Sequence, residues 1–388
     1  MFWKNLKTWR KGLIIGVIPL ITTIIATIVL FITALPPEST FEVLRLMILL
    51  SASYIFSFVF LVSGVLIGIV FRKSRKTKVL TFLIVVLIFI TPVFYGFSGK
   101  PPSGEIGIYK GIWPPVLPYT AKMLLLDIEQ LKEDGVNTLS FGPSYNTNPE
   151  GIIREYPLMK ELTILFIKTA HRNGFRVFLV PNLWDPDLST ERIDRDLFFE
   201  QATKISLEWA EIAERYGVEM YAPQNEPSMV VPDKEAVNQW AHDVAIEIKE
   251  KYHGILVYKA APAEWGFDND YKGYDYVGLD LFPYNQTLDE WRRDVKFHLE
   301  KGLEYAERDG AKGVMFSEIG VQVGQIEGTV STTKTPFSLD YQKEAYKIFF
   351  EEGKDKVAGF VFCCWESNMG PNGYPAEQVM KEWFNKID

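Results

Sequence analysis

The first hundred residues contain three long stretches without a charged side chain, Leu13–Leu35, Leu46–Phe71 and Val79–Gly99. About 20 consecutive apolar residues cross the hydrocarbon core of a bilayer as a helix. The pattern therefore predicts three transmembrane helices, at 13–35, 46–71 and about 79–98. The alternative is a set of buried helices in a soluble domain. Such helices usually keep a polar face, and these stretches have almost none.

From residue 100 onward the pattern changes to short apolar runs that alternate with amphipathic stretches. Runs rich in Val, Ile, Phe and Tyr predict eight strands. They lie at 106–112, 136–142, 175–181, 218–223, 255–260, 276–282, 313–317 and 357–364. Apolar residues at a helical period predict helices at 121–133, 158–172, 198–216, 234–252, 288–308, 341–351 and 376–386. The segment 262–275 is too short and polar for a full helix.

Eight strand–helix units are typical of a (β/α)8 barrel. Glycines that precede five of the strands fit helix C-caps. They are Gly135, Gly174, Gly217, Gly254 and Gly310. An open, doubly wound sheet is the alternative, but no glycine-rich phosphate turn follows the first strand. We therefore expect two domains, a membrane anchor at 1–99 and a TIM barrel at 100–388.

The charge distribution separates the same two parts. Residues 1–100 contain eleven Lys and Arg and two acidic residues, a net charge of +9. The whole chain carries −8, which leaves −17 for residues 101–388. An acidic domain of this size would repel phosphate, so we expect no nucleic-acid partner.

Lys and Arg also predict the orientation in the membrane. Basic residues gather before the first predicted span and in the loop 72–78, whereas the loop 36–45 carries Glu38 and Glu42. The positive-inside rule then puts the N-terminus in the cytoplasm and the barrel outside it. We expect a multi-pass protein of the cell membrane that contacts the bilayer through residues 13–98.

Two residue types limit the chemistry. The chain has four histidines, none of them directly after a predicted strand, so a His-metal site or a Ser-His-Asp triad is not expected. The two cysteines, Cys363 and Cys364, are adjacent and give no disulfide framework. We expect no metal and no organic cofactor.

Carboxylates follow two of the predicted strands, Glu226 after the fourth and Glu318 after the seventh. The carboxyl ends of all barrel strands face one mouth, where TIM-barrel enzymes have their active sites. Two carboxylates can divide the roles of acid and nucleophile in the cleavage of an acetal. Amides and aromatic rings suited to sugars follow other strands. The expected lining is Asn225, Tyr284, Trp365, Asn182, Trp184 and Tyr145.

The segment Asn225-Glu226-Pro227 resembles the NEP motif of the clan A retaining glycoside hydrolases, which include cellulase-, mannanase- and galactanase-type barrels. Ser317-Glu318-Ile319-Gly320 is similar to their nucleophile segment. The resemblance covers residues 104–388. It implies a retaining enzyme that cleaves β-glycosidic bonds of oligo- or polysaccharides without a cofactor, and it leaves the predicted membrane anchor unexplained.

The resemblance also implies a role for each matched residue. Glu226 would be the general acid/base and Glu318 the nucleophile. Asn225 would bond the sugar 2-hydroxyl or orient the acid, Tyr284 would hold the nucleophile, and Trp365 would lie beneath the sugar. The two carboxyl groups of a retaining enzyme should be about 5–5.5 Å apart. A much longer separation would direct attention to Glu366 or Asp280.

The chain departs from that pattern in one respect that matters below. The second strand ends in Ser140-Phe141-Gly142-Pro143, without the arginine that many members of the clan carry near the nucleophile. Histidine is also missing after the third and sixth strands. These gaps leave the exact family and the substrate open. A non-catalytic carbohydrate-binding barrel and a transglycosylase of envelope glycans are the alternative functions. The sugar, the linkage and the oligomeric state stay open too.

Overall fold

The computed structural model describes residues 99–104, 107–114, 117–148, 151–183, 194–231, 233–261, 269–324, 338–365 and 367–387. The predicted transmembrane segments at 13–35, 46–71 and 79–98 lie outside these ranges, as do Trp184 and Glu366. Within the described ranges, no helix combines the length and apolar character that a bilayer span needs.

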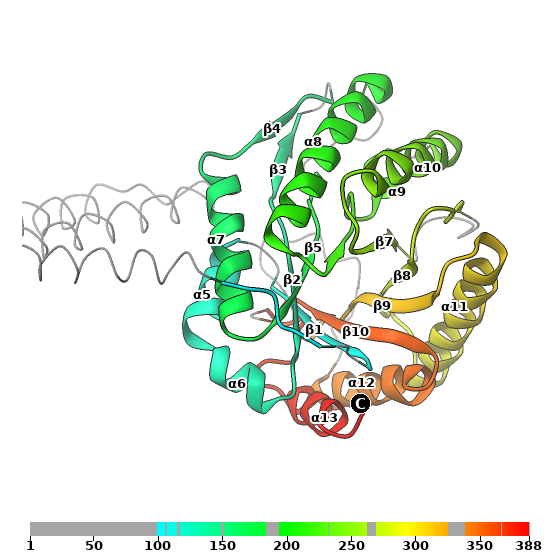
Figure 1. Ribbon diagram of the computed structural model, residues 1–388. Helices are drawn as coiled ribbons and strands as arrows, with labels where there is room; N and C mark the ends of the chain where they lie inside the picture. The colour runs from blue at the N-terminus through cyan, green and yellow to red at the C-terminus, as the bar shows by residue number, and fades with distance from the viewer. Residues whose placement is uncertain are drawn as a thin grey trace, which may run out of the picture. The chain divides into compact units, whose positions relative to one another are not determined.

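Eight parallel strands close into a barrel, in the order β1-β10-β9-β8-β7-β6-β5-β2 (Figure 1). The bounds are β1 Tyr109–Trp113, β2 Thr138–Phe141, β5 Arg176–Leu179, β6 Met220–Tyr221, β7 Ile255–Ala260, β8 Tyr276–Leu281, β9 Gly313–Ile319 and β10 Val357–Cys363. Each matches one predicted strand. The predicted (β/α)8 barrel is confirmed, and closure of β10 on β1 excludes the open sheet.

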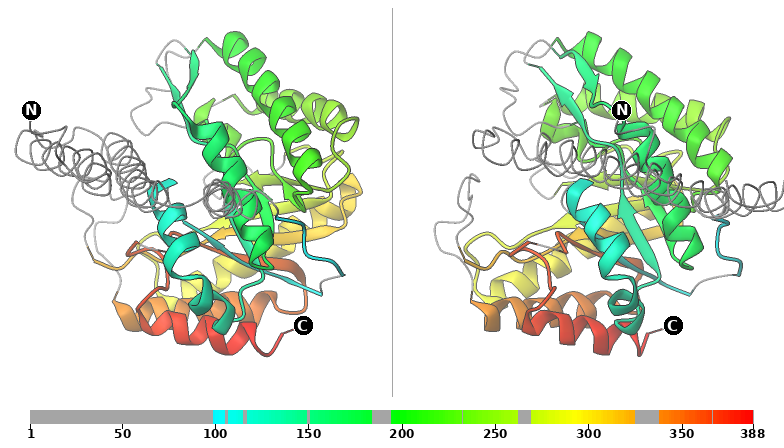
Figure 2. Two further views of the ribbon diagram at one scale, coloured as in Figure 1. Left: turned by 60° about the vertical axis from the view of Figure 1, so that its left-hand side comes forward. Right: turned by 90° about the vertical axis from the view of Figure 1, so that its left-hand side faces the viewer.

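The helices surround the barrel, as the views in Figures 1 and 2 show. They are α5 Leu117–Leu126, α6 Ile128–Glu133, α7 Met159–Arg172, α8 Arg195–Tyr216, α9 Pro227–Val230, α10 Lys234–Lys249, α11 Leu288–Asp309, α12 Leu339–Gly353 and α13 Pro375–Phe384. The helix expected at 121–133 is divided at Asp127 into α5 and α6. Four of the five glycines predicted as helix caps have a positive φ, and Gly254 does not.

Two features of the fold were not predicted. One is the short antiparallel pair β3 Tyr145–Thr147 and β4 Ile153–Glu155, which lies between β2 and α7. The other is α9, a single turn directly after the Asn-Glu-Pro segment. Both are too short to produce a periodic signal in the sequence.

The barrel interior is a packed core and not a pore. Alternate side chains of the strands point inward. Those that meet there include Trp113, Phe178, Val180, Met220, Ala222, Val257, Met315 and Val361. The interior is therefore filled, and chemistry is confined to the ends of the strands.

The connection from β7 to β8 differs from the others, because its described residues, 269–275, contain no helix. Aromatic rings cover the strand there. Tyr271 and Tyr274 pack edge-on against Tyr258 of β7, with ring centroids 5.1 and 5.2 Å away. The absence of a helix in these residues agrees with the short polar segment in the sequence.

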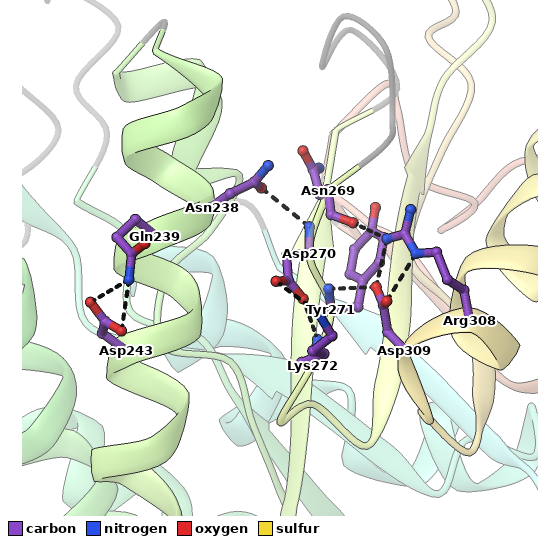
Figure 3. A network of polar contacts seen from close by, with 9 residues as sticks. All are labelled: Asn238, Gln239, Asp243, Asn269, Asp270, Tyr271, Lys272, Arg308 and Asp309. Atoms are coloured by element: carbon purple, nitrogen blue, oxygen red, sulfur yellow. Dashed lines mark hydrogen bonds and ion pairs between the residues drawn. The ribbon is translucent and has the colours of Figure 1, made fainter.

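Hydrogen bonds hold this connection between α10 and α11 (Figure 3). The amide of Asp270 donates to Asn238 of α10 at 3.4 Å, and the amide of Tyr271 donates to Asp309 of α11 at 2.9 Å. Arg308 donates to the carbonyl oxygen of Asn269. The neighbouring helices thus fix the segment that leads into β8, the strand that carries Asp280.

Candidate active site

The carboxyl ends of the eight parallel strands face one end of the barrel, and the candidate residues follow these ends. Glu226 comes after β6, Tyr284 comes after β8, and Glu318 is the next-to-last residue of β9. Cys363 ends β10. We call this end the mouth of the barrel.

The backbone at Glu226 is in the left-handed region, with φ 43° and ψ 63°. A residue with a side chain rarely adopts this conformation, which costs about 1–3 kcal/mol. Pro227 follows at the first position of α9, where a missing N–H costs nothing. Glu226 therefore lies at a fixed turn between β6 and α9, where its backbone follows neither a regular strand nor a regular helix.

Glu318 lies deeper, with its side chain 14% exposed. Nζ of Lys259, a residue of β7, donates a hydrogen bond to its Oε2 at 2.8 Å. Burial raises the pKa of Glu318, while the charge and hydrogen bond of Lys259 and a hydrogen bond from Cys363 act in the opposite direction. The carboxyl group is thus buried next to a cation.

Lys259 also contacts a second acid. Its Nζ lies 3.2 Å from Oδ2 of Asp280 in β8, and both side chains are fully buried. Oγ of Ser317 donates to Oδ1 of Asp280 at 2.6 Å. Burial and the nearby Glu318 charge raise the pKa of Asp280 to about 7, although Lys259 and Ser317 act in the opposite direction. Sequence reasoning named Asp280 only as a reserve carboxylate and did not find Lys259, since one lysine in an apolar strand gives no pattern.

Tyr284 lies at the rim of the mouth, with 46% of its surface exposed. Burial, together with the charges of Glu226 and Glu318, raises the pKa of its hydroxyl to about 12. The hydroxyl is therefore within electrostatic reach of both glutamates. Among the contacts of the described residues there is no hydrogen bond from Tyr284 to Glu318, so the predicted holding contact stays a prediction.

Two asparagines lie nearby at strand ends. Asn225 is 7% exposed, and its backbone N–H donates a hydrogen bond to the carbonyl oxygen of Pro181 at 3.1 Å. Its Oδ1 is buried and has no hydrogen-bond partner in the described part of the chain. Asn182 follows β5 and is half-buried. It forms an isolated parallel β-bridge with Ser144. Their roles toward a sugar stay predictions.

Two of the predicted lining residues are buried in the structure. Trp365 is fully buried, and its Nε1 donates to Asp127 at 3.2 Å. Its ring exposes no face on which a sugar could stack, which favours the role of a core residue. Tyr145 is 5% exposed, and its hydroxyl accepts a hydrogen bond from Nε1 of Trp209 in α8 at 2.6 Å. It packs against α8 instead of lining the mouth.

In the described ranges, no group of three or more His, Cys, Asp or Glu side chains is arranged to hold a metal ion. The mouth instead combines two glutamates, a buried Lys–Asp pair and a tyrosine. A (β/α)8 barrel with acids at the carboxyl ends of its fourth and seventh strands has the layout of a barrel glycosidase.

The chain belongs to Glycoside Hydrolase Family 113, whose family model matches residues 154–386. The matched region includes both glutamates, Asn225 and Tyr284. The chain is therefore a glycoside hydrolase by family, and the resemblance seen in the sequence is confirmed at that level. A comparison with curated proteins found no match.

Solved structures agree on the fold. The GH113 β-mannanase AaManA from Alicyclobacillus acidocaldarius, in complex with ManMIm, matches with a TM-score of 0.58 and 17% identity over 73% of this chain and 99% of that one. A GH113 β-1,4-mannanase matches with a TM-score of 0.56 and 17% identity over the same shares. A β-glucuronidase from an uncultured Clostridium sp. matches with a TM-score of 0.51 and 16% identity, over 72% of this chain and 51% of that one.

Proposed function

We propose that this protein is a retaining glycoside hydrolase that cleaves β-glycosidic bonds with Glu226 and Glu318. One observation carries the proposal: in a member of family 113, the charges of both glutamates act on the same tyrosine hydroxyl, that of Tyr284. Both carboxylates therefore belong to one site at the mouth. The proposed separation of their carboxyl groups is about 5–5.5 Å, the value for a direct nucleophile.

In the first step, an oxygen of ionised Glu318 attacks the anomeric carbon, and a covalent glycosyl ester forms. The bond to the leaving oxygen breaks, its electron pair stays on that oxygen, and Glu226 donates a proton to it. The leaving sugar departs as a neutral alcohol. The left-handed backbone at Glu226, held in spite of its cost, supports a positioned catalytic group.

In the second step, Glu226, now ionised, takes a proton from water as the water oxygen attacks the anomeric carbon. The ester bond to Glu318 breaks and its electron pair returns to the carboxylate. Two inversions at one carbon leave the product with the configuration of the substrate. Asn225 is the proposed partner of the sugar 2-hydroxyl, since its buried Oδ1 has no hydrogen-bond partner among the described residues.

The first substrate class that we propose is β-1,4-mannan. It rests on the two family 113 β-mannanases, which match over 99% of their own lengths. β-Glucuronides come second, because the β-glucuronidase matches over about half its length and with a lower TM-score. A transglycosylase shares the first chemical step and differs only in the acceptor. A non-catalytic binding barrel is less favoured, since both acids are present.

We also propose that three helices at 13–35, 46–71 and 79–98 tether the barrel to the outer face of the cell membrane. The support is the uncharged stretches and the distribution of Lys and Arg. Protease added to intact cells should digest residues 101–388. Protection of that region until the cells are lysed would reverse the orientation.

The test of the proposed activity uses the full-length protein on mannan, mannooligosaccharides and a panel of aryl β-glycosides. Product chromatography separates hydrolysis from transfer, and NMR of the first-formed sugar reports its anomeric configuration. We expect release of sugar with the β configuration retained. An inverted first product would remove Glu318 as the nucleophile, and binding without turnover would favour the non-catalytic barrel.

A further inference from the structure

Lys259 is a cation that lies entirely inside the barrel, where a charge is costly. Its side chain has no exposed surface, and its Nζ lies 3.8 Å from the centre of the Trp113 ring. The other contacts are the two acids already described, Glu318 at 2.8 Å and Asp280 at 3.2 Å. A buried ammonium keeps its proton only when acids and hydrogen-bond acceptors compensate for the lost water.

The surroundings show which of the two acids the cation serves. Burial opposes the charge of Lys259, but Asp280 and Glu318 raise the pKa of its ammonium group above the ordinary value. The pKa of Asp280 is raised to about 7, so below neutral pH this acid carries a proton. Ser317 already supplies Asp280 with a short hydrogen bond. Glu318 is also the nearer acid to the ammonium group, at 2.8 Å against 3.2 Å for Asp280.

The end of β2, Ser140-Phe141-Gly142-Pro143, carries no basic residue. Gly142 follows that strand, and a Cβ atom there would lie 1.8 Å from the carbonyl oxygen of Val180. A side chain at this position would collide with backbone, so the position is restricted to glycine. Trp113, from β1, covers the lysine on another side through its ring face.

We propose that Lys259 is a positioning residue that keeps Glu318 ionised and fixes the orientation of its carboxylate through the Oε2 contact. This inference rests on the proposed function, because it assigns the nucleophile role to Glu318. The cation comes from the fifth barrel strand, β7. It acts through Glu318 and does not itself need to touch the sugar.

The test measures the protonation of Glu318 directly and does not depend on turnover. A water-soluble carbodiimide activates protonated carboxyl groups, and glycine methyl ester captures them. Peptide mass mapping of the full-length protein then gives the extent of labelling at Glu318 as a function of pH. In Lys259→Met, which keeps the length of the side chain without the charge, we expect the midpoint for Glu318 to rise by about 1 to 3 pH units.

Two controls separate this effect from a general loss of structure. Glu155, an exposed carboxyl at the end of β4 whose pKa burial also raises, lies away from Lys259, so its midpoint should not move. Lys249→Met removes an ion pair on the outer surface, with Asp275 at 2.7 Å, and should leave the midpoint of Glu318 unchanged. Lys259→Gln replaces the methionine variant if that one does not fold.

Activity adds a second readout. Glu318 is harder to ionise in Lys259→Met, so the acidic limb of the pH profile of kcat/KM should move to higher pH. Below that limb, kcat/KM should fall about 10-fold for each pH unit. In Lys259→Ala, added propylammonium, which matches the atoms removed, should restore part of the rate. A loss without a shift in pH profile, and without rescue, would indicate a structural role and overturn the proposal.

The outcomes distinguish the two proposals. An unchanged Glu318 midpoint in an active Lys259→Met enzyme would overturn the positioning role and leave the glycosidase intact. A shifted midpoint in a protein that cleaves no β-glycoside would support the role of the cation and overturn the proposed reaction.

Discussion

The ion pairs at the mouth and those on the helical shell differ in almost every respect. On the shell, Lys249 pairs with Asp275 and Arg292 pairs with Glu351, and the basic side chains are 40% and 43% exposed. Such pairs contribute about 0–1 kcal/mol each. At the mouth, Lys259 and Asp280 are fully buried, and their desolvation works against stability.

The backbone shows the same contrast. On the shell, Asp233, Thr287 and Ser338 each begin a helix with a side chain that accepts a hydrogen bond from the backbone. At the mouth, Glu226, Asn285 and Cys364 have positive φ values at or just after the ends of β6, β8 and β10. Leu158, which begins α7 at φ 65°, is an exception on the shell, whereas the three other residues of this kind follow strands at the mouth.

The largest effect should come from Glu318→Ala at the mouth. Without the nucleophile no glycosyl ester forms, and we expect kcat to fall by at least about 10⁴-fold, measured on the best substrate of the panel. Glu351→Gln, which changes a carboxylate on the shell, should keep wild-type activity. A Glu318→Ala enzyme with an ordinary rate would place the nucleophile elsewhere.

Glu226→Ala should cost less and depend on the leaving group. Loss of a general acid typically costs 10²–10⁴-fold, and we expect a loss of this order, about 10³-fold, on mannan. An aryl glycoside with a good leaving group needs little protonation and should lose less in its first step. Azide should rescue this variant by replacing the water that Glu226 activates. Equal losses on both substrates, without rescue, would contradict the acid/base role.

Two aspartates, Asp280 at the mouth and Asp275 on the shell, should respond to pH in opposite directions. The pKa of Asp280 is raised by burial, so its protonated form adds stability at low pH that is lost as pH rises through about 7. At Asp275 burial is outweighed by hydrogen bonds from Leu256, Lys249 and Lys312, which lower the pKa. The contribution of Asp275 to the stability of the fold is present above pH about 4 and is lost below it.

Thermal melting from pH 3 to 8 tests this pair. The melting temperature of the wild type should decline toward neutral pH, and Asp280→Asn should remove this decline. Asp275→Asn should lower the melting temperature, and most strongly at neutral pH. Each unit of pKa shift corresponds to about 1.4 kcal/mol. Parallel pH profiles in the two variants would remove the distinction between mouth and shell.

The smallest effect is expected at the start of α11. Oγ1 of Thr287 accepts a hydrogen bond from the amide of Glu290, whose carboxylate accepts one from the amide of Thr287. Thr287→Ala should lower the free energy of unfolding by about 1 kcal/mol without changing kcat. Thr287→Ser keeps the hydroxyl and serves as the control. A clear loss of activity in Thr287→Ala would mean that the shell shapes the mouth.

The barrel could be predicted from the sequence because each strand is a compact apolar run and most helices repeat apolar residues at a regular period. β7 was found with its exact bounds, 255–260. β3, β4 and α9 were missed, because three or four residues carry no period. The two glutamates could be found because they stand directly after strands, and parallel strands bring such positions to one end.

The environment of the glutamates could not be predicted in the same way. Lys259 approaches Glu318 from a different strand, 59 positions away in the sequence, and only closure of the barrel brings the two together. The burial of Trp365 depends on packing from several elements, among them Asp127 at the α5–α6 junction. The sequence supplies the residues at a strand end, whereas their partners depend on tertiary packing.

The pairing of β1 with β10 has a consequence for the order of folding. Trp113, the ring that covers Lys259, sits opposite Cys363 in this pairing, and its carbonyl oxygen accepts a hydrogen bond from the amide of Trp365. The earliest and latest strands to be synthesised must meet before the mouth is complete. Contacts between such distant parts of a chain form slowly, because a long loop has to close first. The pocket around Glu318 should therefore be the last part of the barrel to form when the protein folds.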